Sequence, residues 1–565
     1  MFSKKLNSIF LVLSSALIFS GCAKKPVADM IFYHGTILTV DKNMTEAQAV
    51  AIKDGKIIAV GNEKEVLRHR DQKTKLVDLK GRTLMPGFVE THSHPYEKLV
   101  IENFTTDIRP AFYRDGAEIM KVIKATIAKA KPGEYLVFFG WDPLVQKGLT
   151  NPTIQQLDAM APNNPLFIWG NSNHIAFVNS KVFQLAGIDK NTPNPGGSAG
   201  GTFGHDANGE LNGRLDQGAP IEMAIAPFLK TKLTNLDESA RYMAKSWQIS
   251  ASDGITTITD SFLLPEFYEI YKETAKKYKA KRLRGYAVDY EKWQPFEGDE
   301  MVKANGGKIF IDGSPWTGTI TMTEPYLVND TTVKIMETPP GYMQKPYVTQ
   351  QELQTFIDNC LKSRRGVEIH AEGDQAIQMA LDAIENGLKK YPWQDHRIAL
   401  QHVPMIRDDQ LKRAKRLGVQ VTFLMAHVKY WGDVIPTLVG DERGRRWCPV
   451  ASAKKYGVNF AFHFDGPTSP NKPIEVLQTA VTRKTISDNV LGPEECISID
   501  DAIRGYTINA AYELFMDKEV GSIEVGKFAD LIILSDNPRR VPPDGISDIK
   551  VLATYVNGEQ IFSAN

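Results

Sequence analysis

Cysteine is scarce in this chain, with four in 565 residues. Cys22 lies near the N-terminus, and Cys360, Cys448 and Cys496 are far apart, without CxxC spacing. An odd number of widely spaced cysteines after Cys22 excludes a disulfide framework of the kind that stabilises small exported domains. Buried free thiols are the simpler interpretation of these three.

An excess of charge of either sign is also absent, because 67 Lys and Arg balance 67 Asp and Glu. The chain therefore has no general attraction to nucleic acid or another polyanion. Internal repeats and low-complexity tracts are absent as well, and a composition of 42% hydrophobic and 24% charged residues is that of a globular protein. Because 565 residues exceed one ordinary core, we expect two domains.

The N-terminus has the features of an export signal. Two lysines precede an apolar run over residues 9–19, which is too short to span a bilayer comfortably and ends in small residues. The Phe-Ser-Gly-Cys end of this segment resembles a bacterial lipobox, which implies a lipoprotein signal over residues 1–22 and lipidation of Cys22. The resemblance further implies a cell-envelope protein, anchored by its lipid to the periplasmic or extracellular face of a bacterial membrane. A plain signal peptide with an incidental cysteine is the alternative.

Short apolar strands separated by turns occupy both ends of the remaining chain. Residues 49–61 contain two such strands around Asp54-Gly55, and an Asp-Gly pair between strands is a strong hairpin signal. Apolar runs of the same style return within residues 529–558. We expect residues 28–85 and 516–565 to form one small β-sandwich, with the middle of the chain inserted between them.

Between these ends, apolar strand-like runs alternate with amphipathic helical stretches such as residues 351–362 and 375–390. Alternation over roughly 400 residues predicts a parallel sheet, and at this length an α/β fold with a (β/α)8 TIM barrel, here over residues 86–515 with insertions. The Gly-, Asn- and Pro-rich segment 191–218 is predicted to be a long loop near the barrel mouth. The strand-like runs lie at residues 135–139, 165–169, 254–258, 308–311, 366–370, 397–402, 419–423 and 458–462.

Histidine and aspartate residues stand at the ends of several predicted strands. The sequence Pro-Gly-Phe-Val-Glu-Thr-His-Ser-His over residues 86–94 is typical of a strand that ends in two histidines on the same side. Two later runs each close with a histidine, and a third is followed by an aspartate. Chemistry in such barrels lies at the carboxyl ends of the strands, and imidazole and carboxylate groups are ligands of divalent metals. The candidate metal ligands are His92, His94, His370, His402 and Asp465.

The order of these residues resembles the amidohydrolase superfamily, with His-x-His on strand 1, single histidines on strands 5 and 6, and an aspartate on strand 8. Within it the chain is most similar to the amidohydrolase 3 group of N-substituted formamide deformylase-like hydrolases, over residues 28–565. The chain departs from the group's usual residues at Glu90, Glu372 and Gln401, where Asp, Ile and Glu are commoner. Further supporting segments lie at residues 140–142, 174–180, 308–314, 427–433 and 521–531.

The resemblance implies one or two Zn²⁺ ions as cofactor and a metal-related role for Lys308. Other superfamily members carry in a similar strand a lysine carboxylated by CO2, whose carbamate bridges two metals. Carboxylation requires a neutral amine, which a desolvated and cation-rich pocket favours by lowering the lysine pKa. A solvated lysine at the start of a strand is the alternative for Lys308.

The implied reaction is hydrolysis of a non-peptide carbon–nitrogen bond in an amide, formamide or cyclic amide by metal-activated water. Asp465 is the expected catalytic residue, which accepts a proton from water and passes it to the leaving nitrogen. Residues expected to orient the ligands are Glu90, Thr91, Asp312 and His463. Residues expected to bind substrate are Trp141, His174, Trp316, His427 and Trp431.

The expected partner is a small amide-type molecule, with membrane contact through the lipid anchor, no nucleic acid, and a homodimer as a further expectation. Two alternatives use the same fold and the same activated water, namely a deaminase and a hydrolase of dipeptides or esters. A third alternative belongs to a different class, a non-catalytic envelope lipoprotein that binds a small ligand. Loss of a metal ligand would indicate that case, and here every expected ligand is present.

Overall fold

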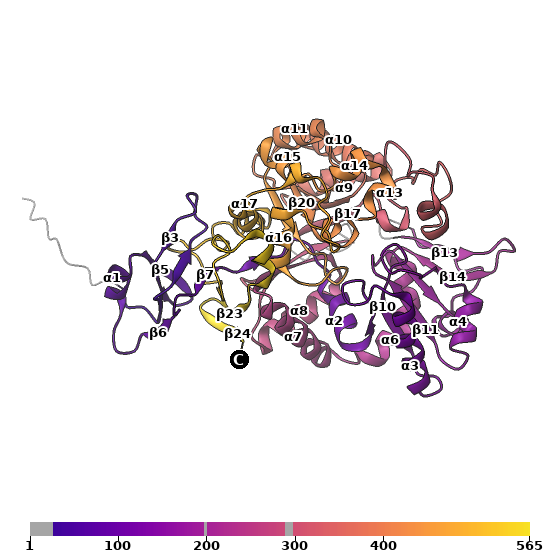
Figure 1. Cartoon of the computed structure of the whole chain (residues 1–565), viewed down its shortest axis with the longest axis horizontal. Coiled ribbons are helices and arrows are strands. Elements are labelled where there is room, and N and C mark those ends of the chain that lie inside the picture. The colour runs from indigo at the N-terminus through magenta and orange to yellow at the C-terminus, as the bar shows by residue number, and fades with distance from the viewer. Residues whose placement is uncertain (1–25, 197–199, 289–297, 565) are drawn as a thin grey trace, which may run out of the picture.

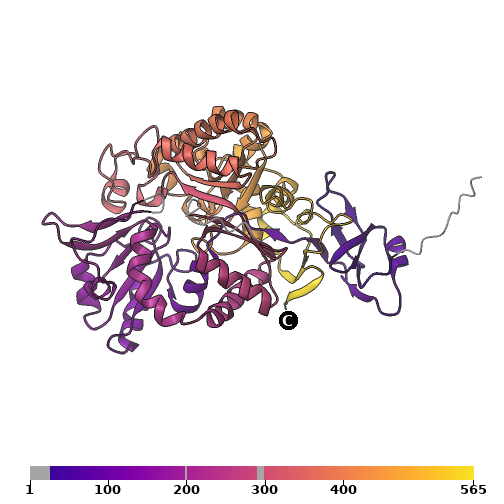
Figure 2. The ribbon, with the colours of Figure 1, turned by 180° about the vertical axis from the view of Figure 1, so that it is seen from behind.

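The computed structural model describes residues 26–196, 200–288 and 298–564. The predicted signal segment and Cys22 lie outside these ranges. The molecule is elongated, with a β-rich lobe at one end, a curled parallel sheet in the middle and a mixed sheet at the other end (Figures 1 and 2). Within the described ranges, none of the helices has the length and apolar character needed to cross a bilayer.

Both ends of the chain contribute strands to the β-rich lobe, which we call the terminal lobe. Its elements are β1 (Met30–Tyr33), β2 (Thr36–Leu38), β3 (Glu46–Ala47), β4 (Ala49–Lys53), β5 (Lys56–Gly61), α1 (Glu63–Val66), β6 (Lys75–Asp78), β7 (Thr83–Pro86), β22 (Leu531–Leu534), β23 (Val551–Val556) and β24 (Glu559–Ser563). One sheet has the order β5-β4-β1-β6, and the other has β24-β23-β22-β7-β2-β3. The C-terminal strand β22 therefore pairs directly with the N-terminal strand β7, in antiparallel register.

The hairpin that the sequence predicted is present in the terminal lobe. Asp54 and Gly55 connect β4 to β5 with φ angles of 48° and 75°, the left-handed conformation that a two-residue hairpin turn requires. The two sheets share one hydrophobic cluster. Within it the rings of Phe32 and Tyr555 meet edge to face, 5.1 Å between centroids. Residues from opposite ends of the chain thus pack into one small core.

The central sheet is parallel and eight-stranded, and it curls as a TIM-like barrel does. Its strands are β8 (Phe88–Val89), β15 (Ile255–Leu263), β16 (Arg282–Ala287), β17 (Val302–Phe310), β18 (Gly366–Ala371), β19 (Ala399–His402), β20 (Gln420–Leu424) and β21 (Phe460–His463). Hydrogen bonds join each strand to the next in this order, from β8 to β21. The two edges also meet, because the Thr91 hydroxyl donates to the carbonyl of Phe462 at 3.3 Å and Glu90 accepts from the amide of Phe464 at 3.2 Å.

Helices follow the strands of the curled sheet. They are α2 (Pro95–Phe104), α7 (Leu236–Ser252), α8 (Pro265–Lys277), α9 (Gln350–Lys362), α10 (Asp374–Lys390), α11 (Asp408–Leu417), α12 (Ala426–Trp431), α13 (Ile435–Val439), α14 (Asp441–Arg445), α15 (Val450–Lys455), α16 (Pro473–Thr482), α17 (Ile499–Gly505) and α18 (Ile508–Glu513). The two helices predicted from apolar spacing are confirmed as α9 and α10. A capping box between Thr349 and Glu352 starts α9 and satisfies the free N–H groups of its first turn.

A second inserted sheet corrects two sequence predictions. Its order is β13-β14-β12-β11-β10-β9. It contains the runs at residues 135–139 and 165–169, which belong to this sheet and not to the curled one. The segment 191–218 is not simply a long loop, because it supplies two of these strands. The elements are β9 (Thr106–Asp107), α3 (Gly116–Lys129), β10 (Leu136–Trp141), α4 (Ile154–Met160), β11 (Leu166–Gly170), β12 (Ile175–Val178), α5 (Ser180–Ala186), β13 (Thr202–His205), β14 (Leu211–Asp216) and α6 (Gly218–Lys232).

The inserted sheet is buried on both faces, which explains the error. Along β10, Leu136 and Phe138 pack into a separate cluster with helix α3, whereas Val137 and Phe139 pack into the main core. A strand that is buried on both faces has a continuous apolar sequence in any sheet. The apolar run alone therefore cannot show which sheet the strand joins.

Candidate metal centre

The predicted ligands lie at the carboxyl ends of neighbouring strands. His92 and His94 follow β8, His370 lies in β18, His402 ends β19 and Asp465 comes just after β21. His402 has a φ of 72° and Asp465 a φ of 53°. Non-glycine residues in this left-handed region cost of order 1–3 kcal/mol and concentrate at functional sites.

His92, His94 and Asp465 form a first group of ligand atoms, all within 4.8 Å of one another. Asp465 Oδ1 lies 3.5 Å from His92 Nε2 and 3.3 Å from His94 Nε2. Two ligand atoms of a tetrahedral zinc ion, with bonds of about 2.1 Å, are about 3.4 Å apart. The separations in this group therefore match those of atoms that share one ion.

His370, His402 and Glu372 form a second group, also within 4.8 Å. The ring of His402 joins the two groups, with its centroid 4.5 Å from that of His370 and 4.6 Å from that of His92. From the sequence, Glu372 was only a departure from the family pattern. The carboxylate two residues after His370, directly after the end of β18, was the signal that could have identified it.

Hydrogen bonding supports a metal at this position. Within the described residues, polar atoms of the two groups are buried without a hydrogen-bond partner: His94 Nδ1, His370 Nδ1, both ring nitrogens of His402, Glu372 Oε2 and Asp465 Oδ1. Buried polar atoms are nearly always satisfied in native proteins, so a concentration of unsatisfied ones indicates an ion that completes the site. Imidazole nitrogen and carboxylate oxygen are the donor set that Zn²⁺ prefers.

The charge states of His370 and His402 fit this interpretation. Burial lowers the pKa of His370 to about 3 and the pKa of His402 well below its usual value, so both rings are neutral and have a lone pair to offer. Burial also lowers the pKa of His94, but the charges of Glu97 and Asp465 outweigh it and raise this pKa to about 9. Burial raises the pKa of Asp465, but His94 outweighs that effect and holds the pKa below its usual range.

Lys308 lies on β17, buried next to the first group. Its side chain is fully buried, and Nζ is 3.4 Å from His92 Nδ1. Burial lowers the pKa of Lys308 to about 8, although the negative charge of Glu368, opposite it on β18, acts against this shift. A neutral amine is therefore accessible at mildly alkaline pH, as carboxylation requires.

The expected orienting residues lie around the two groups. Asp312 Oδ1 is 3.3 Å from His370 Nδ1. Glu90 accepts a hydrogen bond from Tyr506, and Thr91 contacts β21 through its hydroxyl. His463 lies inside the ligand cluster, with its ring centroid 4.9 Å from that of His92 and 4.8 Å from that of His402.

The aromatic substrate candidates do not all approach the ligands. Trp316 stacks on Trp431 at 4.9 Å between centroids, and His427 meets Trp316 edge to face at 4.8 Å. Trp431 and His427 are buried, and Trp431 Nε1 donates to Asp142 Oδ2 at 2.8 Å. Trp141 and Trp316 both line one small cavity. Trp316, Trp431 and His427 therefore pack against one another, and Trp316 and Trp141 are the aromatic candidates that border this small cavity.

His174 does approach the ligands. It lines a cavity of about 60 Å³ next to His94, which we call the inner cavity. The other lining residues of the inner cavity are Glu97, Asn173, Gln217, Gly218, Phe262 and Phe310. The ring of His174 is 5.7 Å from that of His370, centroid to centroid. The inner cavity therefore reaches the predicted ligands, because His94 is part of its wall.

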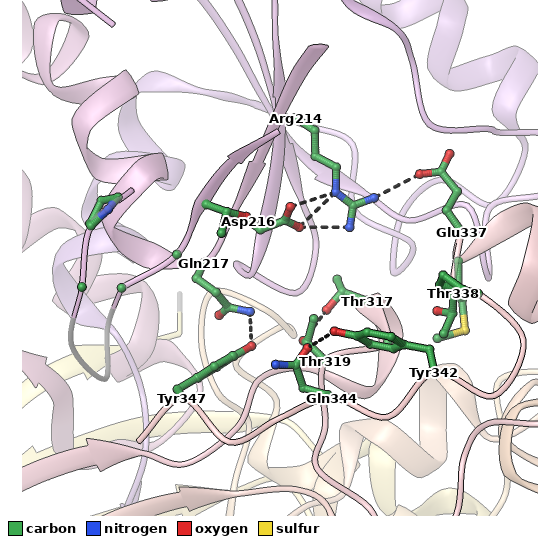
Figure 3. A pocket seen from close by; sticks show the side chains of 18 residues that line it. Arg214, Asp216, Gln217, Thr317, Thr319, Glu337, Thr338, Tyr342, Gln344 and Tyr347 are labelled. Carbon is green, nitrogen blue, oxygen red and sulfur yellow. Dashed lines mark hydrogen bonds and ion pairs between the residues drawn. The ribbon is translucent and has the colours of Figure 1, made fainter. Parts of the chain in front are cut away.

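A larger cavity, of about 560 Å³, lies outside the ligand cluster, and we call it the outer cavity (Figure 3). Its wall is partly polar and partly apolar, and an ion-pair network of Arg214 with Asp216 and Glu337 lies along one side. Gln217 lines both cavities. Its side chain bonds the ring of His174 at 2.6 Å on one side and the hydroxyl of Tyr347 on the other. Gln217, which sequence reasoning missed, thus separates the metal-facing space from the outer one.

Comparisons with known proteins agree with this arrangement. The N-substituted formamide deformylase of Arthrobacter pascens is 26% identical over 94% of this chain and 97% of that protein. The putative amidohydrolase YtcJ of Bacillus subtilis (strain 168) is 26% identical over 94% of this chain and 99% of that protein. The structure of an uncharacterized metal-dependent hydrolase from Pyrococcus horikoshii OT3 superposes with a TM-score of 0.71 at 23% identity, covering 91% of this chain and 99% of that one.

A family model described as the amidohydrolase family matches residues 75–562, nearly the whole described chain. The resemblance inferred from the order of the ligands is therefore confirmed. The chain belongs to the amidohydrolase family and is a metal-dependent hydrolase of carbon–nitrogen bonds that acts on a small molecule.

Proposed function

We propose that this hydrolase cleaves an N-substituted formamide or a similarly small amide into an acid and an amine. The supporting observation is the pair of cavities beside the ligand cluster, about 60 Å³ inside and about 560 Å³ outside Gln217. A formyl or other short acyl group suits the inner cavity, and the substituent on nitrogen suits the outer one. The Arthrobacter pascens relative is named for this class of substrate.

We propose zinc as the metal. His92, His94 and Asp465 would hold one ion, His370 and His402 would hold a second, and a carboxylated Lys308 would be a further ligand. When bound, such ions polarise the substrate carbonyl and make water nucleophilic near neutral pH. The unpartnered ligand atoms support this assignment.

Residues of this chain would transfer the proton, bind the amide group and restrict water. Asp465, whose pKa lies below its usual range, is ionised at neutral pH and is suited to accept a proton from water and deliver it to the leaving nitrogen. His174, held by Gln217 at 2.6 Å, is positioned to bind the amide group in the inner cavity. Phe262 and Phe310 line that cavity and limit access of bulk water.

We further propose the division of the chain expected from sequence: a β-sandwich of residues 28–85 and 516–565 and a (β/α)8 barrel of residues 86–515 with insertions, of which the second sheet is one. The shared core of the two terminal sheets supports the first part. Lipidation at Cys22 and location in the cell envelope are proposals that rest on the lipobox-like segment alone. Membrane fractionation of the wild type and Cys22→Ser tests them, and dimerisation stays a prediction for sedimentation analysis.

The proposed function is tested on the purified full chain with a panel of N-formyl and N-acyl amines. We expect bound zinc, loss of activity on chelation and recovery when Zn²⁺ is returned. Asp465→Asn should lower kcat by at least about 100-fold, since it removes the general base. Asp433→Asn is the matched control, because its carboxylate bonds Thr485 and Asn489 away from the cavities.

Two results would contradict the proposal. A wild type that is free of transition metal and active on the panel would refute the metal-dependent mechanism. Full metal content without turnover of any formamide or short-chain amide would refute the substrate class.

A further inference from the structure

Glu372 is a buried carboxylate within reach of two candidate ligands. Its side chain is 3% exposed, and Oε2 has no hydrogen-bond partner among the described residues. Oε1 lies 3.7 Å from His402 Nδ1. This separation is close to the roughly 3.4 Å expected between two ligand atoms of one tetrahedral zinc ion.

The backbone directs this side chain toward the site. Glu372 comes directly after β18, two residues beyond His370, and residues two apart on a strand point to the same side. Asp312 accepts hydrogen bonds from the amides of Glu372 at 3.0 Å and Gly373 at 2.8 Å. These two bonds hold the end of the strand in place before helix α10 begins at Asp374.

A structural role does not account for Glu372. Among the described residues, its ion contacts include neither lysine nor arginine, and the His402 ring beside it is neutral. A buried carboxylate is costly without a cation to offset its charge.

We propose that Glu372 is a protein ligand of the second metal ion, together with His370 and His402. The inference rests on the proposed metal-dependent function and deepens it. Two imidazoles and one carboxylate form a donor set of zinc hydrolases that leaves an open position for water or substrate. The second ion then has an anionic protein ligand of its own and does not depend on a carboxylated Lys308.

The test measures metal binding rather than activity. Full-length protein is stripped with a chelator and titrated with Zn²⁺ by calorimetry, and bound metal is counted by mass spectrometry. We expect two equivalents in the wild type. Glu372→Gln, which keeps the shape and removes the charge, should weaken the second equivalent by at least about tenfold and leave the first unchanged.

Three further variants complete the design. Glu372→Ile introduces the residue that is common in the group, so it keeps the inference testable if Glu372→Gln folds poorly. Asp433→Asn is the matched control, because its carboxylate bonds Thr485 and Asn489 away from the cavities, and both equivalents should remain. Lys308→Met should retain the second equivalent, since Glu372 supplies the anionic ligand.

The outcomes separate this inference from the proposed function. Wild-type affinity for both equivalents in Glu372→Gln and Glu372→Ile would overturn the inference and leave metal-dependent hydrolysis intact. A wild type with a single equivalent that neither variant weakens would also overturn it. A wild type that binds no zinc would refute the proposed function itself.

Discussion

Asp312 accepts hydrogen bonds from the backbone amides of Thr321, Glu372 and Gly373, and it lies 3.3 Å from His370 Nδ1. Burial raises the pKa of Asp312 to about 7, although these bonds act against the shift. One side chain thus connects two loop segments, at Thr321 and at residues 372–373, to a candidate ligand. Residues of this type show that the precision of the site depends on groups that do not themselves reach the metal.

Gln217 holds the ring of His174 in the wall of the inner cavity. Gln217→Leu removes the hydrogen bonds to His174 and Tyr347, and a buried ring without its partner costs about 1–3 kcal/mol. We expect kcat/KM for formamides to fall by about 10- to 100-fold in steady-state kinetics. Tyr347→Phe removes only the outer partner and should have a smaller effect. An unchanged kcat/KM in Gln217→Leu would be inconsistent with a positioning role.

Stability is expected to depend on pH through the buried carboxyl group of Glu513, which is not itself a candidate metal ligand. Burial raises its pKa from 4.5 to about 7, against hydrogen bonds from Thr422 and Gln401. Between these values the unfolded chain has lost the proton and the folded state retains it, so the stabilisation is complete below pH 4.5 and is lost as pH rises through 7.

We therefore expect Glu513→Gln, which is neutral throughout, to gain stability relative to the wild type between pH 4 and pH 8, by up to about 3 kcal/mol. Melting temperatures of both proteins at these pH values measure the difference. A difference that does not vary with pH would show that Glu513 ionises normally in the folded state.

At the scale of single elements, strand β16 was absent from the sequence prediction. Its sequence begins Arg-Leu-Arg-Gly, and the two arginines interrupt the apolar pattern on which the prediction depended. The strand is nevertheless buried along its whole length. Arg282 is fully buried because Nε donates to Asp530 Oδ2 at 2.7 Å and a further nitrogen contacts Glu300 at 2.9 Å. Asp530 directly precedes β22, so this ion pair connects the curled sheet to the terminal lobe.

Arg282→Met should destabilise the protein by about 3–5 kcal/mol, because it leaves Asp530 buried without its cation. Thermal or denaturant unfolding measures the loss. Arg445→Met is the control, since Arg445 and Glu494 form an exposed pair that contributes about 0–1 kcal/mol. Adding Asp530→Asn to Arg282→Met should recover part of the loss. Equal stabilities of Arg282→Met and Arg445→Met would contradict the connecting role of the ion pair.

At the scale of the whole molecule, the two chain ends hold the terminal lobe together. The C-terminal strands lie against the N-terminal ones in both views (Figures 1 and 2). The curled sheet begins at β8, directly after β7, and β7 pairs with β22. The strand that leads into His92 and His94 is therefore held by the C-terminal part of the chain.

Deletion of residues 551–565 removes β23 and β24 and takes Ala553 and Tyr555 out of the shared core. We expect the melting temperature to fall by many degrees, or the protein to become insoluble, since β22 then presents an unpaired edge. Deletion of only residues 564–565 leaves every strand intact and serves as the control. Equal melting temperatures of the two truncated proteins would show that the C-terminal strands are dispensable.

Local patterns were sufficient for much of this protein. The Asp54-Gly55 hairpin and helices α9 and α10 were predicted correctly, because turn chemistry and helical spacing depend on neighbours in sequence, as does the order of the candidate ligands at predicted strand ends. The amidohydrolase family followed from the same order. Lipidation at Cys22, the metal ligands and the domain boundaries stay predictions.

Tertiary structure alone decided which sheet each strand joins and which polar residues meet. Strands β10 and β11 are as apolar as those of the curled sheet, and only long-range pairing separates them. Gln217 and Tyr347 come from distant segments, and their sequence surroundings carry no period that marks a site. The sequence by itself thus determined the class of chemistry through the spacing of its histidines, whereas the shape of the cavities and the full set of buried ligand atoms depend on contacts between residues far apart in the chain.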